Sequence, residues 1–354
     1  MTNKQEKTKE ETKERRRLPA EWEPVEAVLT AWPHGDTDWR DMLPEVEKCY
    51  TEMCSAIAGH ALLIVAGPQK ALARARECLR GIEDGRVEYV EVPTNDTWAR
   101  DFGAITVETD GQPRAVDFKF NGWGLKFASD KDNLVTRRLG IFAREPENRL
   151  SFVLEGGSIE SDGRGTLLTT SECLLSPNRN GGMSHKEIEE TLKEDFGLQR
   201  VLWLEHGGLA GDDTDSHIDT LARLAPPGDV IFHTGCSDPD DEHFGPLRAM
   251  AEELKALQTA DGLPYTLIEL PLPDPIHDPE DGTRLPATYA NFLIVNDAVL
   301  MPIYGQPLKD RQAMDSIRVA MPEYTVVGVD CRALIRQHGS LHCATMQFPI
   351  GTLK

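Results

Sequence analysis

The sequence predicts an α/β protein that folds as one domain. Short apolar runs typical of strands alternate with amphipathic segments of helical period along the whole chain. No Ser/Gly-rich linker and no break in composition interrupts this alternation. With 354 residues and 40% hydrophobic content, the chain can also bury a large core. We therefore expect a single domain over residues 18–354.

The elements follow in order from these patterns. Residues 1–17, MTNKQEKTKEETKERRR, are nearly all polar or charged and cannot bury enough apolar area to offset the entropy of ordering, so we expect a disordered tail there. Apolar runs predict strands at 26–32, 61–67, 87–92, 114–120, 165–170, 200–204, 229–234, 265–270, 291–296, 298–304 and 324–330. Helical periodicity predicts helices over 43–58, 69–81, 185–196, 244–259 and 308–321. No sequence repeat is evident, although this recurrence permits a structural one.

Charge and composition limit the classes of function. The formal net charge of −21 disfavours binding to nucleic acid or anionic membranes and favours a cationic small molecule. No stretch approaches the ~18 apolar residues of a membrane helix, and the N-terminus lacks the apolar core of a signal peptide, so we expect a cytoplasmic protein. The seven cysteines contain no C-x-x-C pair, which suits neither a disulfide framework nor a zinc site. Formation of a homo-oligomer stays open.

Four segments concentrate polar residue types beyond what a core needs. They are TNDTWARDFGA (94–104), LEGGSIE (154–160), GDDTDSHIDTLAR (211–223) and HGSLHCATMQ (338–347). Each alone has an ordinary structural explanation, such as an acidic turn, a strand-to-loop junction or a buried thiol. His217 and Asp219 are two residues apart, so a strand would project both side chains from one face.

Taken together, these segments offer the parts of a cysteine-dependent enzyme. Cys343 would need a partner for its proton, because a free thiol is mostly protonated at neutral pH, and His217 can be that partner. Glu155 is a candidate to orient the histidine. Asp101 and Asp219 then have no role in a simple cysteine–histidine scheme, and their charge would suppress the thiolate unless a cation lay between them. A planar guanidinium, gripped by two carboxylates, fits that requirement.

These motifs resemble the agmatine deiminases and the Porphyromonas-type peptidyl-arginine deiminases of the guanidine-modifying superfamily. The resemblance also includes LPAEWEPVEAVLTAWPH (18–34), LLTTSECLLSPNRN (167–180) and TYANFLIVNDAVLMPIYG (288–305), and it covers essentially all of 18–350. It implies a five-bladed α/β propeller of ββαβ units around a pseudo-fivefold axis, with the site in the central cavity. It also implies that no cofactor and no metal is needed.

The resemblance implies a role for each motif residue. Asp101 and Asp219 would hold the guanidinium, and Cys343 would attack its carbon. His217 would act as acid and base beside Glu155. Trp98 would line the pocket, and Asn291 matches a polar residue of the family. The implied reaction converts agmatine and water to N-carbamoylputrescine and ammonia through a covalent amidino-cysteine intermediate.

The sequence departs from the family pattern near the site, at positions that shape the pocket for the rest of the substrate. His338 and Ser340 stand where a glycine and an asparagine are usual, and Glu160 replaces a histidine. Peptidyl arginine and free arginine are alternative substrates. Agmatine is favoured by the acidic residues near the motifs, Glu160 among them, and by the scarcity of cations there; Asp213 is the predicted distal contact.

A metal-dependent hydrolase is the alternative from another class. It would use an oxygen-rich cluster made of Asp212, Asp213, Asp215, His217 and Asp219, which suits Mg²⁺ or Mn²⁺.

Overall fold

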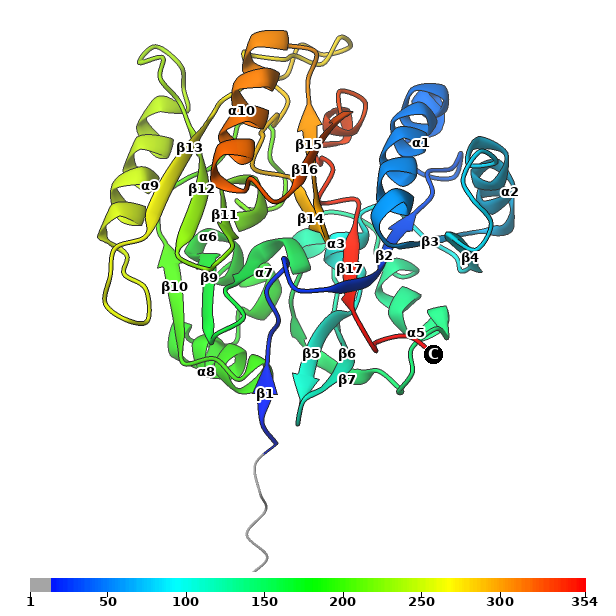
Figure 1. Cartoon of the computed structure of the whole chain (residues 1–354), viewed down its shortest axis with the longest axis horizontal. Coiled ribbons are helices and arrows are strands. Elements are labelled where there is room, and N and C mark those ends of the chain that lie inside the picture. Colours follow the sequence, from blue (N-terminus) through cyan, green and yellow to red (C-terminus); the bar gives the residue numbers. More distant parts are fainter. Residues whose placement is uncertain (1–13) are drawn as a thin grey trace, which may run out of the picture.

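The computed structural model describes residues 14–354, and its strands form five small sheets (Figure 1). The first sheet contains β1 (Arg16–Arg17), β5 (Ile105–Thr109), β6 (Gln112–Lys119) and β7 (Glu147–Val153), and the second contains β8 (Ile159–Ser161), β9 (Thr166–Thr170) and β10 (Arg200–Leu204). The third contains β11 (Ala222–Ala225), β12 (Val230–Gly235) and β13 (Thr266–Pro271), and the fourth contains β14 (Leu293–Val295), β15 (Ala298–Ile303) and β16 (Thr325–Asp330). The fifth contains β17 (Met346–Pro349), β2 (Val25–Ala31), β3 (Leu62–Gly67) and β4 (Val87–Glu91).

All five sheets share one pattern of pairing. A first strand pairs antiparallel with a second, and the second pairs parallel with a third; these first strands are β5, β8, β11, β14 and β17. Parallel neighbours require a crossover, and helices supply it between the second and third strands. The structure therefore contains the structural repeat that the sequence permitted. The fifth sheet differs in two respects: β4 extends it beyond its third strand, and its first strand, β17, follows the other strands in the chain whereas β2 precedes them.

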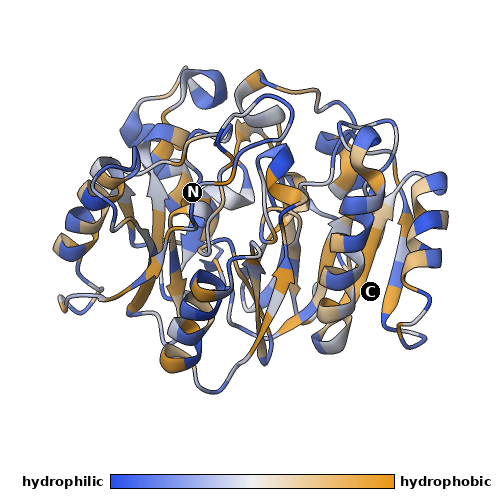
Figure 2. Cartoon of the chain, turned by 90° about the horizontal axis from the view of Figure 1, so that it is seen from above, coloured by the Kyte–Doolittle hydropathy of each residue, from blue (hydrophilic) through white to orange (hydrophobic). Residues whose placement is uncertain are grey.

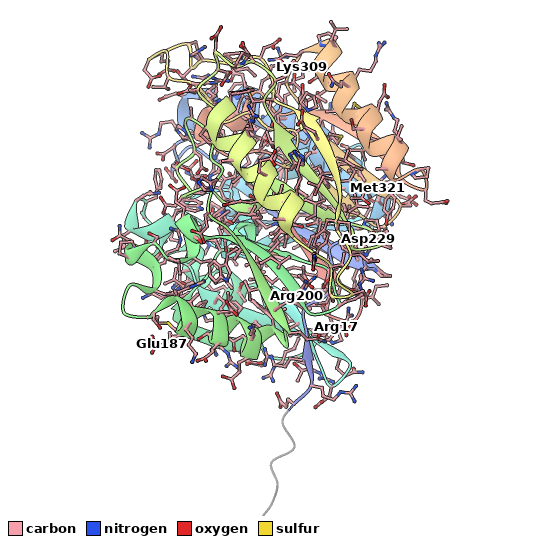
Figure 3. All side chains as sticks on the ribbon, turned by 90° about the vertical axis from the view of Figure 1, so that its left-hand side faces the viewer. Arg17, Glu187, Arg200, Asp229, Lys309 and Met321 are labelled. Atoms are coloured by element: carbon pink, nitrogen blue, oxygen red, sulfur yellow. The ribbon has the colours of Figure 1, made fainter. Side chains whose placement is uncertain are left out.

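The five predicted helices are confirmed. They are α1 (Leu43–His60), α2 (Gln69–Cys78), α8 (His185–Phe196), α9 (Phe244–Ala256) and α10 (Pro307–Ala320). Figure 2 shows their outer faces largely hydrophilic and the strands largely hydrophobic, as expected for helices that cover sheets. Local sequence also fixes helix ends: Ser184 and Glu187 form a capping box at the start of α8, and Glu187 is labelled on the outer surface in Figure 3.

All eleven predicted strands are present, and the structure adds six that the sequence did not predict: β1, β5, β7, β8, β11 and β17. Shorter helices lie in the connections: α3 (Ala99–Phe102), α4 (Gly122–Leu125), α5 (Val135–Leu139), α6 (Ser171–Leu174) and α7 (Pro177–Asn180).

The predicted disordered tail requires one correction. Residues 1–13 lie outside the described residues, but Arg16 and Arg17 form β1 against β5. Their guanidinium groups pair with carboxylates of the folded chain, Arg16 with Glu147 and Arg17 with Glu23. Charge at these positions therefore supports a strand, because acidic partners are fixed elsewhere in the fold. Within residues 14–354, no helix combines the length and the apolar character that crossing a membrane requires.

Candidate active site

The predicted site residues occupy equivalent places in the five sheets, because each precedes the first strand of one sheet. Asp101 lies on α3 before β5, and Glu155 lies just before β8. Asp219 precedes β11, Asn291 precedes β14 and Cys343 precedes β17. Five segments that are far apart in the sequence thus each bring one polar group to the same end of a first strand. The structure differs from prediction at His217 and Asp219, which lie at a short 3-10 helix (Ile218–Thr220) and not on a strand.

Gly157 is the point around which three of these groups gather. A β-carbon at this glycine would stand 2.6 Å from Nδ1 of His217, 2.9 Å from Oδ1 of Asp101 and 3.0 Å from Oδ2 of Asp219. The backbone N–H of Gly157 donates to Oδ1 of Asp101 at 3.0 Å, and the indole N–H of Trp123 donates to Oδ2 at 2.9 Å. The histidine and both aspartates therefore surround one position, which only a glycine can occupy.

His217 lies fully buried between two carboxylates. Its Nδ1 is 3.6 Å from Asp101 Oδ1, and its Nε2 is 3.9 Å from Glu155 Oε2. Burial alone would lower the pKa of His217, but Asp101 and Cys173 hold it well above its usual range. The two carboxylates therefore favour the protonated imidazole, which is the state that a general acid needs.

The environment of Cys343 disfavours the thiolate. Its Sγ lies 3.4 Å from Asn291 Oδ1 and 3.9 Å from Asp219 Oδ2. Burial raises the pKa of the Cys343 thiol well above its usual range, and the charges of Asp219 and Asp101 raise it further. A cation placed among these groups would reverse that effect, because it would offset both carboxylates and stabilise the anionic sulfur.

Asn291 connects the loop of Cys343 to that of Asp219. Its Oδ1 accepts from the backbone N–H groups of His342 and Cys343 at 2.9 and 3.3 Å, and its Nδ2 donates to the carbonyl of Asp219 at 3.3 Å. The side chain is fully buried. These contacts position the two loops; direct contact of Asn291 with a substrate stays a prediction.

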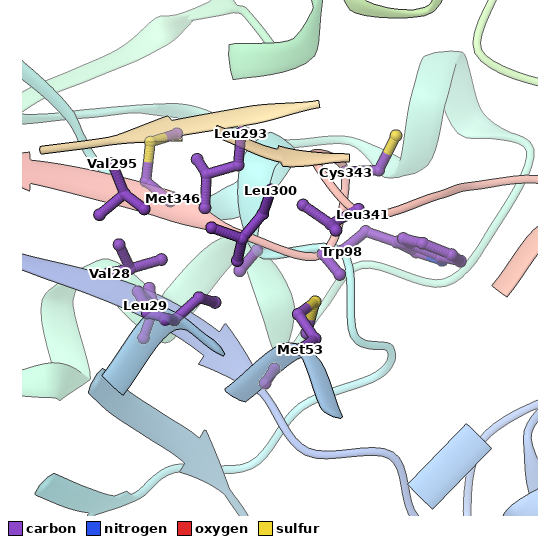
Figure 4. Close-up of a cluster of buried hydrophobic side chains, with 14 of the residues drawn as sticks. Val28, Leu29, Met53, Trp98, Leu293, Val295, Leu300, Leu341, Cys343 and Met346 are labelled. Carbon is purple, nitrogen blue, oxygen red and sulfur yellow. The ribbon is translucent and has the colours of Figure 1, made fainter. Parts of the chain in front are cut away.

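A pocket opens directly onto the thiol of Cys343. The empty space within it, open mouth included, is about 410 Å³. Its lining includes three residues that the sequence predicted, Trp98, Asp101 and Asp213, and others that it did not: Asp38, Asp96, Trp123, Phe127, Thr214, Gln337, His338 and Gly339. The lining contains four carboxylates and neither arginine nor lysine. Figure 4 shows Trp98 and Cys343 at the edge of a buried apolar cluster.

Two residues of the Cys343 loop shape this pocket. A β-carbon at Gly339 would meet the ring of Trp98 at 2.2 to 2.8 Å, so only glycine lets the indole lie there. His338 has a φ of 66°, in the left-handed region that glycine adopts most easily, and its Nδ1 is 2.7 Å from the carbonyl of Gly211. The departure from glycine at position 338 therefore places an imidazole in the wall of the pocket.

Arg179 is a residue of the site that sequence reasoning missed. Its Nε donates to both carboxylate oxygens of Glu155, at 3.1 and 2.9 Å, and its Nη2 donates to the carbonyl of Thr214 at 2.8 Å. Its Nη1 lies 2.5 Å from Asp215 Oδ2. Arg179 thus fastens Glu155 to the loop that carries His217. The motif SPNRN alone does not predict this role, because the partners of its arginine lie far away in the chain.

Glu160 requires a correction, because we interpreted it as part of the acidic surroundings of the substrate. The structure buries Glu160 in an ion pair with Arg223, and its Oε2 accepts from the backbone N–H of Leu224 at 3.1 Å. It lines a different cavity, together with Glu21, Arg100 and His342. Glu160 therefore balances Arg223 and adds no charge to the pocket at Cys343.

The acidic segment 212–219 does not form the oxygen cage of the metal alternative. Asp212 accepts from the backbone N–H of Ser216 at 2.7 Å, and Asp215 pairs with Arg179 and Lys126. Among residues 14–354, two other buried sets have suitable ligand atoms within 4.8 Å of one another: Glu155, Cys173 and His217, and Glu21, Glu160 and His342. In each set an arginine already hydrogen-bonds a carboxylate, which is a poor arrangement for a divalent cation.

Comparison with known families matches residues 17–349 to the model of the Porphyromonas-type peptidyl-arginine deiminases. The chain belongs to this family. An agmatine deiminase from Pseudomonas aeruginosa is 34% identical over 358 residues, which cover 94% of this chain and 95% of that protein. The likeness to the family therefore extends over nearly the whole chain.

Two solved structures of this family are close to the chain. A C. jejuni agmatine deiminase, solved as a cysteine-to-serine variant with substrate bound, is 39% identical, with a TM-score of 0.89 over 96% of this chain and 98% of that one. A candidate arginine deiminase from Porphyromonas gingivalis is 50% identical, with a TM-score of 0.87 over 96% of this chain and all of the other. The relatives thus carry names for two different guanidine substrates.

Proposed function

We propose that this protein is an agmatine deiminase, which hydrolyses agmatine to N-carbamoylputrescine and ammonia. The observation that carries the proposal is the pocket at Cys343: it joins a thiol to Asp101 and to three further carboxylates, and it contains no arginine or lysine. Agmatine has a guanidinium at one end and an ammonium at the other, so an acidic pocket complements both ends.

Binding would begin with the two aspartates next to His217. Oδ1 of Asp219 is buried and has no hydrogen-bond partner among the described residues, so it is free to accept from a guanidinium N–H. Asp101 would hold a second edge of the planar group. The bound cation would lower the pKa of the Cys343 thiol and allow it to lose its proton inside the complex.

Catalysis would then proceed in two stages. The Cys343 thiolate attacks the guanidinium carbon and forms a neutral tetrahedral adduct, whose nitrogens stay hydrogen-bonded to the two aspartates. His217 gives its proton to the departing nitrogen, and ammonia leaves a covalent amidino-cysteine. Neutral His217 next removes a proton from water, which attacks the same carbon. The sulfur departs and the ureido product is released.

Activity on three guanidines tests the proposal. Release of ammonia and ureido product would be measured with agmatine, free arginine and a peptide that ends in arginine. We expect agmatine to exceed the other two by at least about a hundredfold in kcat/KM, about 2.7 kcal/mol of transition-state discrimination. Equal turnover of arginine or of the peptide would overturn the assignment of substrate.

The nucleophile has its own test. Cys343→Ser should fold and bind agmatine but retain less than about a tenth of wild-type kcat, because a hydroxyl is a much poorer nucleophile and no base is arranged for it. Mass spectrometry of wild type quenched during turnover should show an amidino adduct on the peptide that contains Cys343. Cys173→Ser is the control for a buried thiol beside His217 and should show the same adduct.

Arginine deimination is the second candidate, favoured by the 50% identity to the Porphyromonas gingivalis protein. A substrate with a carboxylate normally needs an arginine fork. The arginines near the motifs are all paired: Arg179 with Glu155 and Asp215, and Arg100 and Arg223 with carboxylates around the cavity behind His342. This arrangement supports agmatine over arginine.

We also propose that residues 18–354 form a single catalytic domain whose five sheets are the blades of an α/β propeller. The shared strand order supports this, as does the pairing of β17 with β2, which joins the two ends of the chain in one sheet. The position of one polar residue before each first strand also supports a common axis near the site.

A further inference from the structure

His342, the residue before the nucleophile, is buried between two carboxylates. Its Nδ1 lies 2.7 Å from Oδ2 of Asp219, and its Nε2 lies 2.7 Å from Oε2 of Glu21. The side chain is 1% exposed and is not part of the lining of the pocket at Cys343. Its ring therefore does not line the substrate pocket. Nδ1 contacts the carboxylate in front, and Nε2 contacts both the carboxylate behind and Nη2 of Arg223, which is 3.1 Å away.

The partners on the far side of the ring are held firmly. Oε2 of Glu21 also accepts from Nη2 of Arg223 at 2.9 Å, and Oε1 accepts from the backbone N–H of Ile294 at 2.8 Å. Arg223 is paired in turn with Glu160, and Arg100 lies 3.8 Å from Glu21. Burial alone would raise the pKa of Glu21, but Arg223 and His342 hold it well below its usual range. Glu21 is thus a fixed anion that can accept from the imidazole.

Among the described residues, His342 alone makes a close hydrogen bond to the side-chain carboxylate of Asp219. Within residues 14–354, Oδ2 is hydrogen-bonded to Nδ1 of His342 and makes a long contact with the Cys343 thiol, and Oδ1 has no hydrogen-bond partner. Burial would raise the pKa of Asp219, but the hydrogen bond and charge of His342 hold it below its usual range. The charged neighbours Asp101, His217, Arg100 and Arg223 complete the surroundings of this carboxylate.

We propose that His342 is a positioning residue for the deimination reaction: it fixes Oδ2 of Asp219 and keeps the carboxylate charged, so that Oδ1 stays free for the guanidinium. Glu21 supports the ring from behind through its contact with Nε2. This inference rests on the proposed function. It explains why a histidine next to the nucleophile need not be the base, since its ring is committed to two carboxylates.

A matched pair of substitutions separates this role from simple packing. The amide nitrogen of asparagine is as many bonds from Cα as Nδ1, and that of glutamine is as many bonds from Cα as Nε2. His342→Asn can therefore still donate to Asp219, whereas His342→Gln keeps only the donor toward Glu21. We expect His342→Gln to raise KM for agmatine about tenfold or more and to move the acid limb of kcat/KM to higher pH. His342→Asn should recover most of both parameters.

Alkylation of Cys343 by iodoacetamide, without substrate, gives an independent reading. If Asp219 loses its charge in His342→Gln, the pKa of the thiol falls and alkylation at neutral pH should be faster than in wild type and His342→Asn. Equal acid limbs and equal alkylation rates in the two variants would overturn the inference. An inactive wild type would instead overturn the proposed function, while the alkylation comparison would still stand.

Should both variants fail to fold, Glu21→Gln carries the test. It removes the far carboxylate and leaves His342 and Asp219 in place. We expect the acid limb of kcat/KM to move to higher pH in this variant as well, because the ring loses the carboxylate that holds it against Asp219. An unchanged acid limb would overturn the inference.

Discussion

The α-carbon of Gly157 lies so close to His217 that a methyl group on it would stand 2.6 Å from Nδ1 of the ring. Glycine at this position is therefore a requirement of the site and not only of the turn. It lets the backbone of one sheet enter the space between catalytic groups of two others, where its N–H can also hold Asp101.

We predict that Gly157→Ala lowers kcat/KM for agmatine by at least about a hundredfold, because a displacement of His217 or Asp101 by about 1 Å is enough for such a loss. Steady-state kinetics would measure it, with circular dichroism to establish folding. Gly59→Ala is the control, since nothing lies within 4 Å of a β-carbon at that exposed helical position. Activity of Gly157→Ala near that of the control would contradict the geometry.

The reactivity of Cys343 should report the charge of its neighbours. In wild type without substrate, we expect iodoacetamide to alkylate Cys343 slowly at about pH 7.5, because burial and Asp219 raise the pKa of the thiol. Asp219→Asn removes one negative charge, so the pKa should fall; a fall of one unit would speed alkylation about tenfold. Partly exposed Cys236 serves as the internal control by peptide mapping. Slower alkylation in the variant would refute this electrostatic account.

The pH dependence of kcat/KM should show the titration of Asp101. Burial raises the pKa of this carboxyl to about 6, and only its ionised form can hold a guanidinium. Activity should therefore be present above about pH 6 and decline as the pH falls below it. At saturating agmatine the decline of kcat should move to lower pH, because the bound cation favours the carboxylate. A flat kcat/KM profile down to about pH 5 would rule out this role.

The raised pKa of Asp101 has the opposite effect on the stability of the folded protein. The folded protein binds the proton of Asp101 more tightly than the unfolded chain does, so its contribution to the free energy of unfolding is greatest at low pH and declines as the pH rises through about 6. Folding therefore disfavours the ionised form of Asp101, which substrate binding requires.

Asp213 should recognise the far end of agmatine. Asp213→Asn should raise KM for agmatine about tenfold with little change in kcat, because it removes a charge from the pocket wall and leaves the reacting groups intact. Turnover of an alkylguanidine of the same length without the amine should be unaffected. Asp261→Asn, at an exposed position, is the matched control. An equal loss with both substrates would show that Asp213 does not contact the amine.

The sequence predicted the outer parts of the fold better than the inner ones. The helix at 244–259 was evident because its apolar residues recur with a helical period, and α9 forms there. The first strands β8, β11 and β17 were missed because they have only three or four residues and adjoin the site motifs. Residues in such places serve chemistry and close packing, so the alternating pattern of a strand is weak.

The site likewise contains residues that the sequence predicted and residues that only the fold reveals. Chemical reasoning grouped Cys343, His217 and two aspartates, because a thiol surrounded by carboxylates requires a cation. It could not find Arg179 or Glu21, whose roles depend on partners many residues away in the chain. Glu21 and His342 are separated by 321 positions, and only the fold shows that they touch.

The pairing of β17 with β2 has a consequence for how the enzyme comes into being. β2 leaves the ribosome long before the segment that carries the thiol, which is the last of the five motifs to emerge. A nascent chain can therefore assemble four sheets before it acquires a nucleophile. On the proposed mechanism, reactivity arrives only with the segment just before β17, so a chain released before Cys343 would be inert.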